Sequence, residues 1–234
     1  MYNILGIILI CVLTNDKTVD SINVRNAGIT SMYCTTHSTT SMGIVKFQGN
    51  GILAYEPEKL RLVNDGALLR TRTLDVGLTP QQVWYWTSRI KPPICNYGEP
   101  KDLSRTKLLN PDVLLNVLCL GQIPTDDIKQ YDYNGYLVIE KSDVKPDNTP
   151  IIHSYMIDVK YQRVVQYTVF DKHQRRLLQA DIRSYYTNDI PENILLNWYE
   201  KGISINWTLK NPRLNVKIPV NMWNMPKYPF MKAL

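Results

Sequence analysis

Few side chains in this sequence stand at a spacing that supports catalysis or metal binding. The three histidines are far apart: we expect His37 in a Thr/Ser-rich turn, His153 on a strand and His173 at the tip of a hairpin. None belongs to a His-x-x-x-His pair or to a cysteine cluster, the spacings typical of zinc ligands. The Gly-x-Ser-x-Gly motif and the glycine-rich phosphate loops are also absent. We therefore expect no catalytic residues, no metal, no cofactor and no enzymatic activity.

Two pairs of acidic residues are candidates for acid–base catalysis. Asp126 and Asp127 follow Pro124 in a loop, and Glu56 and Glu58 flank Pro57 in an extended segment. A hydrolase needs a nucleophile, a base and an oxyanion site together, and neither pair has such company in the sequence. An enzyme whose site is dispersed along the chain stays a third hypothesis, behind two non-enzymatic ones.

The cysteines past the amino-terminal segment are widely spaced. Cys34, Cys95 and Cys119 are separated by 61 and 24 residues and form no Cys-x-x-Cys pair. Two interpretations stay open: three buried free thiols, or one disulfide, Cys34–Cys95 or Cys95–Cys119, in an oxidising compartment.

Composition and charge indicate a globular protein with a basic C-terminal segment. The 234 residues are 44% hydrophobic and 21% charged, too apolar for a disordered chain. The formal charge of +6 lies entirely within residues 201–234, because residues 1–200 hold 21 basic and 21 acidic side chains. This distribution argues against a nucleic-acid-binding protein. It favours either solvated strand edges or contact with anionic lipid head groups. The basic residues of this segment are Lys201, Lys210, Arg213, Lys217, Lys227 and Lys232.

The amino-terminal segment resembles an export signal. Ile4–Leu13 is an apolar run of ten residues, too short to span a membrane but typical of the apolar part of a signal peptide. No basic residue precedes it. Three alternatives stay open: acylation at Cys11 as a lipoprotein, cleavage after Thr14, or an apolar first element of the domain. We expect an exported protein, either periplasmic or anchored in the cell envelope, in which residues 1–13 are the signal.

The rest of the chain predicts an antiparallel sheet with few helices. After residue 40, alternating segments such as Lys59–Val63 are separated by turns, and Gly49-Asn50-Gly51 is typical of a hairpin turn. One clear helix is expected over 111–121, with Asn110 as its cap and Gly121 past its last turn. A weaker helix is expected over 18–26. We predict one domain, residues 18–226, with about ten or eleven strands that curl into an open half-barrel, and a tail over 227–234.

Several segments resemble the outer-membrane lipoprotein carrier superfamily (LolA/LolB-like), in a divergent bacterial lipoprotein branch. The pattern is a strand, a proline, a basic–apolar strand and an aromatic strand that ends near a tryptophan. The resemblance extends over about residues 25–225. It rests on Gly51–Leu62, Asp75–Gly77, Val83–Trp86, Pro92-Pro93, Tyr97-Gly98, the 111–121 helix and Phe170-Asp171.

This resemblance implies a curved antiparallel half-barrel whose apolar concave face is lidded by helices and holds acyl chains. The residues expected to line the cavity are Leu53, Tyr55, Leu60, Leu62, Trp84 and Trp86, with Leu114, Leu115 and Leu118 on the lid. In the carrier branch an arginine directly before the proline latches the lid by donating hydrogen bonds to helix carbonyls. Glu56 occupies that position here, and a carboxylate cannot donate such bonds at neutral pH.

Two non-enzymatic functions follow from the resemblance. The first is an exported protein that binds lipid or lipoprotein acyl chains in the cavity, with membrane contact through the basic C-terminal segment and no nucleic-acid partner. The second is a structural or interaction lipoprotein of the cell envelope, with the same fold but a packed interior. The sequence sets neither the ligand nor the oligomeric state.

Overall fold

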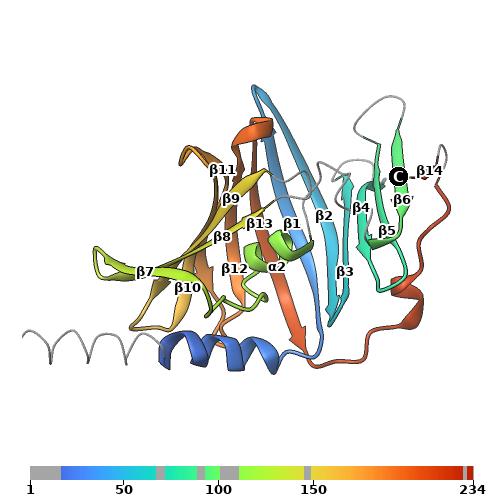
Figure 1. Cartoon of the computed structure of the whole chain (residues 1–234). Helices are drawn as coiled ribbons and strands as arrows, with labels where there is room; N and C mark the ends of the chain where they lie inside the picture. Colours follow the sequence, from blue (N-terminus) through green and yellow to red (C-terminus); the bar gives the residue numbers. More distant parts are fainter. Residues whose placement is uncertain are drawn as a thin grey trace, which may run out of the picture.

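Most of the chain forms one strongly curved sheet (Figure 1). The computed structural model describes residues 17–66, 72–88, 93–100, 111–144, 149–228 and 231–233. Within them the strands are β1 Met32–Met42, β2 Val45–Glu56, β3 Lys59–Gly66, β4 Arg72–Leu78, β5 Val83–Thr87, β6 Ile94–Gly98, β7 Ile128–Tyr133, β8 Tyr136–Val144, β9 Pro150–Asp158, β10 Arg163–Asp171, β11 Arg176–Tyr185, β12 Pro191–Trp198, β13 Ile203–Leu214 and β14 Met231–Ala233. Their order across the sheet is β14-β6-β5-β4-β3-β2-β1-β13-β12-β11-β10-β9-β8-β7.

The prediction of a mainly antiparallel, open sheet is confirmed, but the strand count was too low. The described residues form fourteen strands, not ten or eleven. All pairs are antiparallel except β14, which pairs parallel with Cys95–Tyr97 of β6. The predicted tail therefore contributes a short edge strand to the sheet.

One uncounted strand is β1, because its Thr/Ser-rich sequence was interpreted as a turn around His37. In the structure His37 lies in the middle of β1, opposite Asn50 of β2, and the two side chains are hydrogen-bonded at 2.9 Å. Alternate residues Met32, Cys34 and Thr36 face the interior. Threonine is common in strands, so its density here supports the strand that the structure contains.

The Gly49-Asn50-Gly51 hairpin prediction was wrong, since both glycines lie inside β2. The turn lies earlier, at Gly43 and Ile44, between β1 and β2. A Cβ at Gly49 would stand 1.9 Å from Oδ1 of Asn64, and one at Gly51 would stand 1.9 Å from the backbone carbonyl oxygen of Val63. Gly49 therefore makes room for a side chain of β3, and Gly51 makes room for the β3 backbone.

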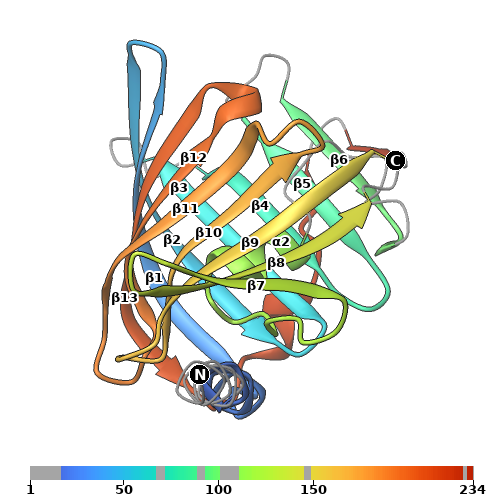
Figure 2. The same ribbon diagram turned by 60° about the vertical axis from the view of Figure 1, so that its left-hand side comes forward.

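Two α-helices lie within the described residues, and both predictions of a helix are confirmed. Helical residues 17–27 lie across one end of the sheet, and α2 (Pro111–Val117) lies against its concave side (Figures 1 and 2). The Asn26 side chain donates to the Gly121 carbonyl at 2.7 Å and so ties the first helix to the segment after α2. None of the described helices is long and apolar enough to cross a membrane.

The expected lid differs from the structure. The α2 residues Leu114 and Leu118 are 2% and 0% exposed and belong to the same hydrophobic cluster as the inward side chains of both halves of the sheet. The helix is therefore packed into the curve of the sheet and contributes to its core. It ends at Val117, and Cys119 in the following turn has a left-handed φ of 55°. A Cβ at Gly121 would lie 2.1 Å from Oδ1 of Asn116.

The β10–β11 turn is held by one carboxylate and predicts a change at low pH. Asp171 accepts the backbone N–H groups of His173 and Arg175 at 2.8 and 2.9 Å, and the Arg175 guanidinium at 2.7 Å. Burial alone would raise the pKa of Asp171, but the hydrogen bonds from Arg175 and His173 outweigh it and lower this pKa to about 2. The ionised side chain therefore stabilises the turn fully above about pH 4 and ceases to do so as the pH falls towards about 2.

We expect a carboxyl ¹³C titration of Asp171 with a midpoint near pH 2, accompanied by loss of amide protection at His173 and Arg175. The Asp171→Asn variant should lack this transition. An Asp171 midpoint near pH 4 would contradict the assignment.

Candidate functional site

The concave face gathers seven of the nine predicted cavity residues. In β2 and β3, Leu53 lies opposite Leu62 and Tyr55 lies opposite Leu60, so these four side chains share one face. All four contact the hydrophobic cluster that includes Leu114 and Leu118, and Leu115 packs against it.

These residues differ in how much of each side chain a ligand could reach. Leu53, Leu60, Leu62, Leu114 and Leu118 are all less than 9% exposed, so core packing already occupies them. Tyr55 and Leu115 are half-buried. The predicted lining is therefore mostly packed, and only Tyr55 and Leu115 are accessible. We call these seven residues the floor.

A second group of accessible apolar side chains on this face was not predicted from the sequence. Leu74, Val76 and Leu78 of β4 and Tyr85 of β5 are half-buried, and we call these four residues the shelf. Register places them beside the floor, because Val76 pairs with both Leu62 and Tyr85. Burial raises the pKa of Tyr85, so its phenol stays neutral. The alternation of Leu74, Val76 and Leu78 was the signal that could have identified the shelf.

Trp84 and Trp86 lie on the opposite, convex face, so the nine residues cannot line a single cavity. Trp84 pairs with Gly77 and Trp86 with Asp75, and both partners face away from the shelf. A strand presents successive side chains to opposite faces. For the tryptophans to share the lining, they would have to pair with the inward residues of β4, such as Val76, and the register is one residue away from that.

On the convex face, Asp75 is the centre of a buried polar cluster. Its carboxylate is 0% exposed and accepts Nε and Nη2 of Arg61 at 3.2 and 2.8 Å, and the Trp84 indole N–H at 2.9 Å. Arg72 approaches it at 3.4 Å, and the Tyr228 hydroxyl donates to it. Burial and the bond to Asp75 raise the pKa of Tyr228 to about 12, so this phenol remains a donor.

The same cluster holds the C-terminal segment 216–228 against the sheet. Arg61 donates to the Met222 carbonyl at 2.6 Å, and the Tyr228 ring stacks on Trp86 with centroids 4.5 Å apart. Arg61 thus performs, towards this segment, the carbonyl-binding role that the resemblance assigned to a latch arginine. The predicted latch position, Glu56, instead forms an ion pair with Lys59 at 3.0 Å across the β2–β3 turn.

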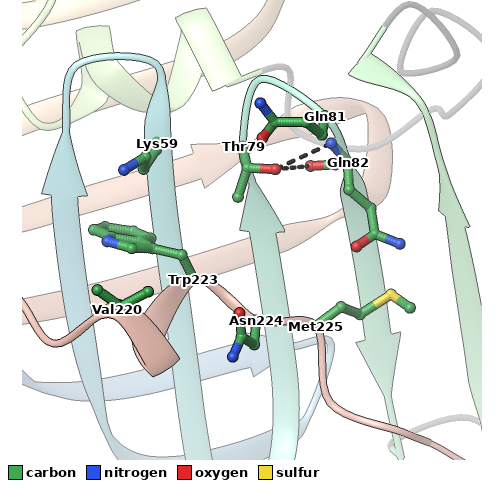
Figure 3. A pocket seen from close by; sticks show the side chains of 8 residues that line it. All are labelled: Lys59, Thr79, Gln81, Gln82, Val220, Trp223, Asn224 and Met225. Atoms are coloured by element: carbon green, nitrogen blue, oxygen red, sulfur yellow. Dashed lines mark hydrogen bonds between the residues drawn. The ribbon is translucent and has the colours of Figure 1, made fainter.

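Where the segment crosses the sheet, it leaves a shallow hollow of about 420 Å³ (Figure 3). Lys59 lies 5.5 Å from the centroid of the Trp223 ring at one side of it. The lining is a mixture of carboxamide, hydroxyl and apolar side chains: Lys59, Thr79, Gln81, Gln82, Val220, Trp223, Asn224 and Met225. This hollow lies on the convex face and is separate from the shelf.

The described residues show free thiols and no metal centre. Cys34, Cys95 and Cys119 are buried and free, and burial raises the pKa of Cys34 to about 12 and that of Cys119 to about 11. Such thiols are unreactive at neutral pH. Across the part of the chain that the structure describes, no three His, Cys, Asp or Glu side chains are placed to hold a metal ion. Cys11 and residues 1–13 lie outside the described residues.

The C-terminal basic segment places its aromatic residues on the protein itself. Trp223 lies beside Lys59, and Tyr228 stacks on Trp86. Arg213 lies 5.0 Å from the ring centroid of Tyr33. The side chain of Lys232 lies outside the description, and contact of this segment with a membrane stays a prediction.

No family model matches the sequence, and no curated protein matches it either. Solved structures do match the fold. A domain described as an outer-membrane lipoprotein-sorting protein from Vibrio parahaemolyticus superposes with a TM-score of 0.60 at 10% identity, over 89% of this chain and 95% of that one. A DUF1329 family protein from Desulfovibrio piger gives 0.60 at 10% identity, over 89% and 96%.

A LolA superfamily protein from Nitrosomonas europaea gives a TM-score of 0.58 at 11% identity, over 88% of this chain and 97% of that one. These matches extend over nearly the whole of each chain, and they confirm the resemblance at the level of the fold. The chain therefore has the fold of the LolA-like proteins, in a divergent form.

Proposed function

We propose that this protein is a non-enzymatic, exported protein that binds lipid or the acyl chains of a lipoprotein on the concave face of its sheet. The shelf is the observation that carries the proposal. Its four side chains are half-buried on the inner face of a curved sheet. Leu74, Val76 and Leu78 pack against the core cluster and keep part of their surface accessible. Two fold neighbours support it, since one is described as an outer-membrane lipoprotein-sorting domain and one as a LolA superfamily protein.

The energetics favour an acyl ligand at this position. Each methylene that leaves water gains about 0.8 kcal/mol. Five methylenes laid over the shelf would therefore contribute roughly 4 kcal/mol before the entropy of ordering is subtracted. Tyr55 and Leu115 are half-buried against the same core cluster and would extend this contact. Export, to the periplasm or to an anchored position in the envelope, is part of the proposal and rests on the apolar run Ile4–Leu13.

The test is binding of a fluorescent fatty acid to the purified protein, together with mass spectrometry of any lipid that co-purifies. We expect Val76→Asn, on the shelf, to weaken probe binding roughly tenfold, because it replaces apolar contact area with a polar amide. The matched control is Leu195→Asn, since Leu195 is also half-buried but lies on the convex face of β12. Equal affinities for the two variants, or a lipid-free protein that binds no probe, would refute the proposal.

One observation favours the second candidate, a structural or interaction protein of the envelope. Leu53, Leu114 and Leu118 are packed to 2% exposure or less, so this part of the concave face is filled by the protein's own side chains. If the shelf is only the edge of that core, Val76→Asn should lower stability and leave no binding function to lose. The probe experiment separates the two candidates.

A further inference from the structure

The β1–β2 hairpin ends in an exposed apolar tip. Ile44 is 101% exposed, Met42 is 50% exposed and Val45 is 47% exposed, and we call these three residues the tip. Hairpin turns are normally built from Gly, Asn, Asp, Ser and Pro, and here only Gly43 fits that pattern, with a φ of +59°. Three large apolar side chains together on a projecting turn are therefore unusual for a surface that faces only water.

The β1–β2 hairpin extends beyond β3, its neighbour in the sheet. On the β13 side, β1 remains paired as far as Met42 and Ile203. On the other side the described pairing of β2 with β3 begins only at Gly49 and Gly66, so Val45–Gln48 reach further than β3 (Figure 2). The tip is thus held at the end of two long strands, away from the core.

The turns at the same end of the sheet carry an exposed tyrosine and an excess of positive charge. Tyr199, 47% exposed, begins the 3₁₀ turn η2 (Tyr199–Lys201), which precedes the Ile203 that pairs with Met42. Register places the β10–β11 turn at the same end, because Leu178 pairs with Trp198. The exposed cations of these three turns are Lys46, Lys172, Arg175, Arg176 and Lys201, against the carboxylates of Asp171 and Glu200, a balance of five to two.

We propose that this end of the sheet docks on a lipid bilayer that contains anionic lipid, with the tip inserted at the boundary between head groups and acyl chains. Apolar side chains on a convex projection have no pocket of their own to fill, but they match the depth of that boundary. Tyrosine is enriched at the same level of a membrane, and the surrounding lysines and arginines match anionic phosphates. The docking surface is separate from the shelf and does not depend on acyl binding there.

The test is co-sedimentation of the full chain with vesicles of phosphatidylcholine, with and without phosphatidylglycerol. We expect binding to the mixed vesicles, and about tenfold weaker partitioning for Ile44→Asn. The matched control is Val24→Asn, because Val24 is 73% exposed on the helix at the opposite end of the sheet. Both side chains are exposed, so neither substitution should unfold the protein.

A second pair of variants tests the electrostatic part. Lys46→Gln should weaken binding to the anionic vesicles roughly fivefold and leave binding to pure phosphatidylcholine unchanged. Lys160→Gln is its control, because Lys160 lies in the β9–β10 turn at the other end of the sheet.

Three outcomes would overturn the docking proposal: no binding of the wild type to mixed vesicles, equal partitioning of Ile44→Asn and Val24→Asn, or equal effects of the two lysine variants. Failure of the proposed function is distinguishable from failure of docking. Ile44→Asn should bind the fluorescent fatty acid like the wild type, whereas Val76→Asn should bind vesicles like the wild type.

Discussion

We expect the Asp75→Asn substitution to lower the free energy of unfolding by about 3–5 kcal/mol, the largest effect that we expect from a single change of charge among the described residues. Asp75 is 0% exposed and Arg61 is 7% exposed, so the substitution leaves a buried guanidinium without its counter-charge. Native proteins are stable by only about 5–15 kcal/mol, and the loss is therefore a large part of the total.

The hydrogen bonds of Asp75 add a second cost, because an asparagine side chain cannot accept hydrogen bonds at both of its terminal atoms. One carboxylate oxygen of Asp75 accepts Nε of Arg61 and the indole N–H of Trp84, and the other accepts Nη2 of Arg61 and the Tyr228 hydroxyl. An asparagine in either orientation turns its NH₂ group towards two donors. A buried donor that faces another donor loses its hydrogen bond and the water it had before folding.

The measurement is urea unfolding of Asp75→Asn and of a matched control variant. Asp65→Asn is the control, because Asp65 also pairs with an arginine, Arg72, but this pair is 36–38% exposed and should contribute less than about 1 kcal/mol. Hydrogen exchange should also quicken at 222–228 in Asp75→Asn, since Arg61 and Tyr228 hold that segment from the cluster. Equal losses of stability for the two asparagine variants would show that the cluster is not a stabilising centre.

This cluster shows where prediction from the sequence reached its limit. The alternation in Lys59–Val63 correctly indicated that Leu60 and Leu62 face inward. The same alternation places Arg61 on the opposite face but does not show whether that face is exposed. The structure buries Arg61 because residues of η3 (Val220–Trp223), about 160 positions later, cover the convex face. Local periodicity assigns a residue to a face but does not reveal what covers that face.

The division of the predicted cavity has a related cause. Each strand was assigned its inward residues separately, and the relative register of β4 and β5 is what places Trp84 opposite Gly77 on the convex side. A shift of one residue exchanges every inward and outward side chain of a strand. The role of the glycines in Gly49-Asn50-Gly51 also depends on another strand, because the atoms that would meet a Cβ there belong to Asn64 and to the backbone of Val63 in β3.

Sequence patterns predicted correctly those elements that depend mainly on residues close together in the chain. The Pro111-initiated helix and the helix over residues 17–27 were both predicted from their own residues, and so was the general antiparallel character of the sheet. The alternation in β4 could have assigned Leu74, Val76 and Leu78 to one face, but their half-buried state depends on packing against a core cluster built from distant segments.

The second large effect concerns Gly77, where we expect Gly77→Ala to lower the free energy of unfolding by about 3 kcal/mol. A Cβ at Gly77 would lie 1.9 Å from Cζ2 of Trp84 and 2.2 Å from its Cε2. The indole cannot simply move aside, because it is fully buried and its N–H donates to Asp75. The added methyl group must therefore displace the tryptophan and break that hydrogen bond.

A double-mutant cycle with Trp84→Leu separates this steric explanation from a general intolerance of alanine in β4. Removing the ring removes the atoms that the methyl group would strike, so Gly77→Ala in the Trp84→Leu background should lower stability by less than about 1 kcal/mol. An unchanged penalty in that background would instead place the cause in the backbone of β4. Because Trp84 donates to Asp75, the steric explanation further requires that Gly77→Ala and Asp75→Asn have less than additive effects when combined.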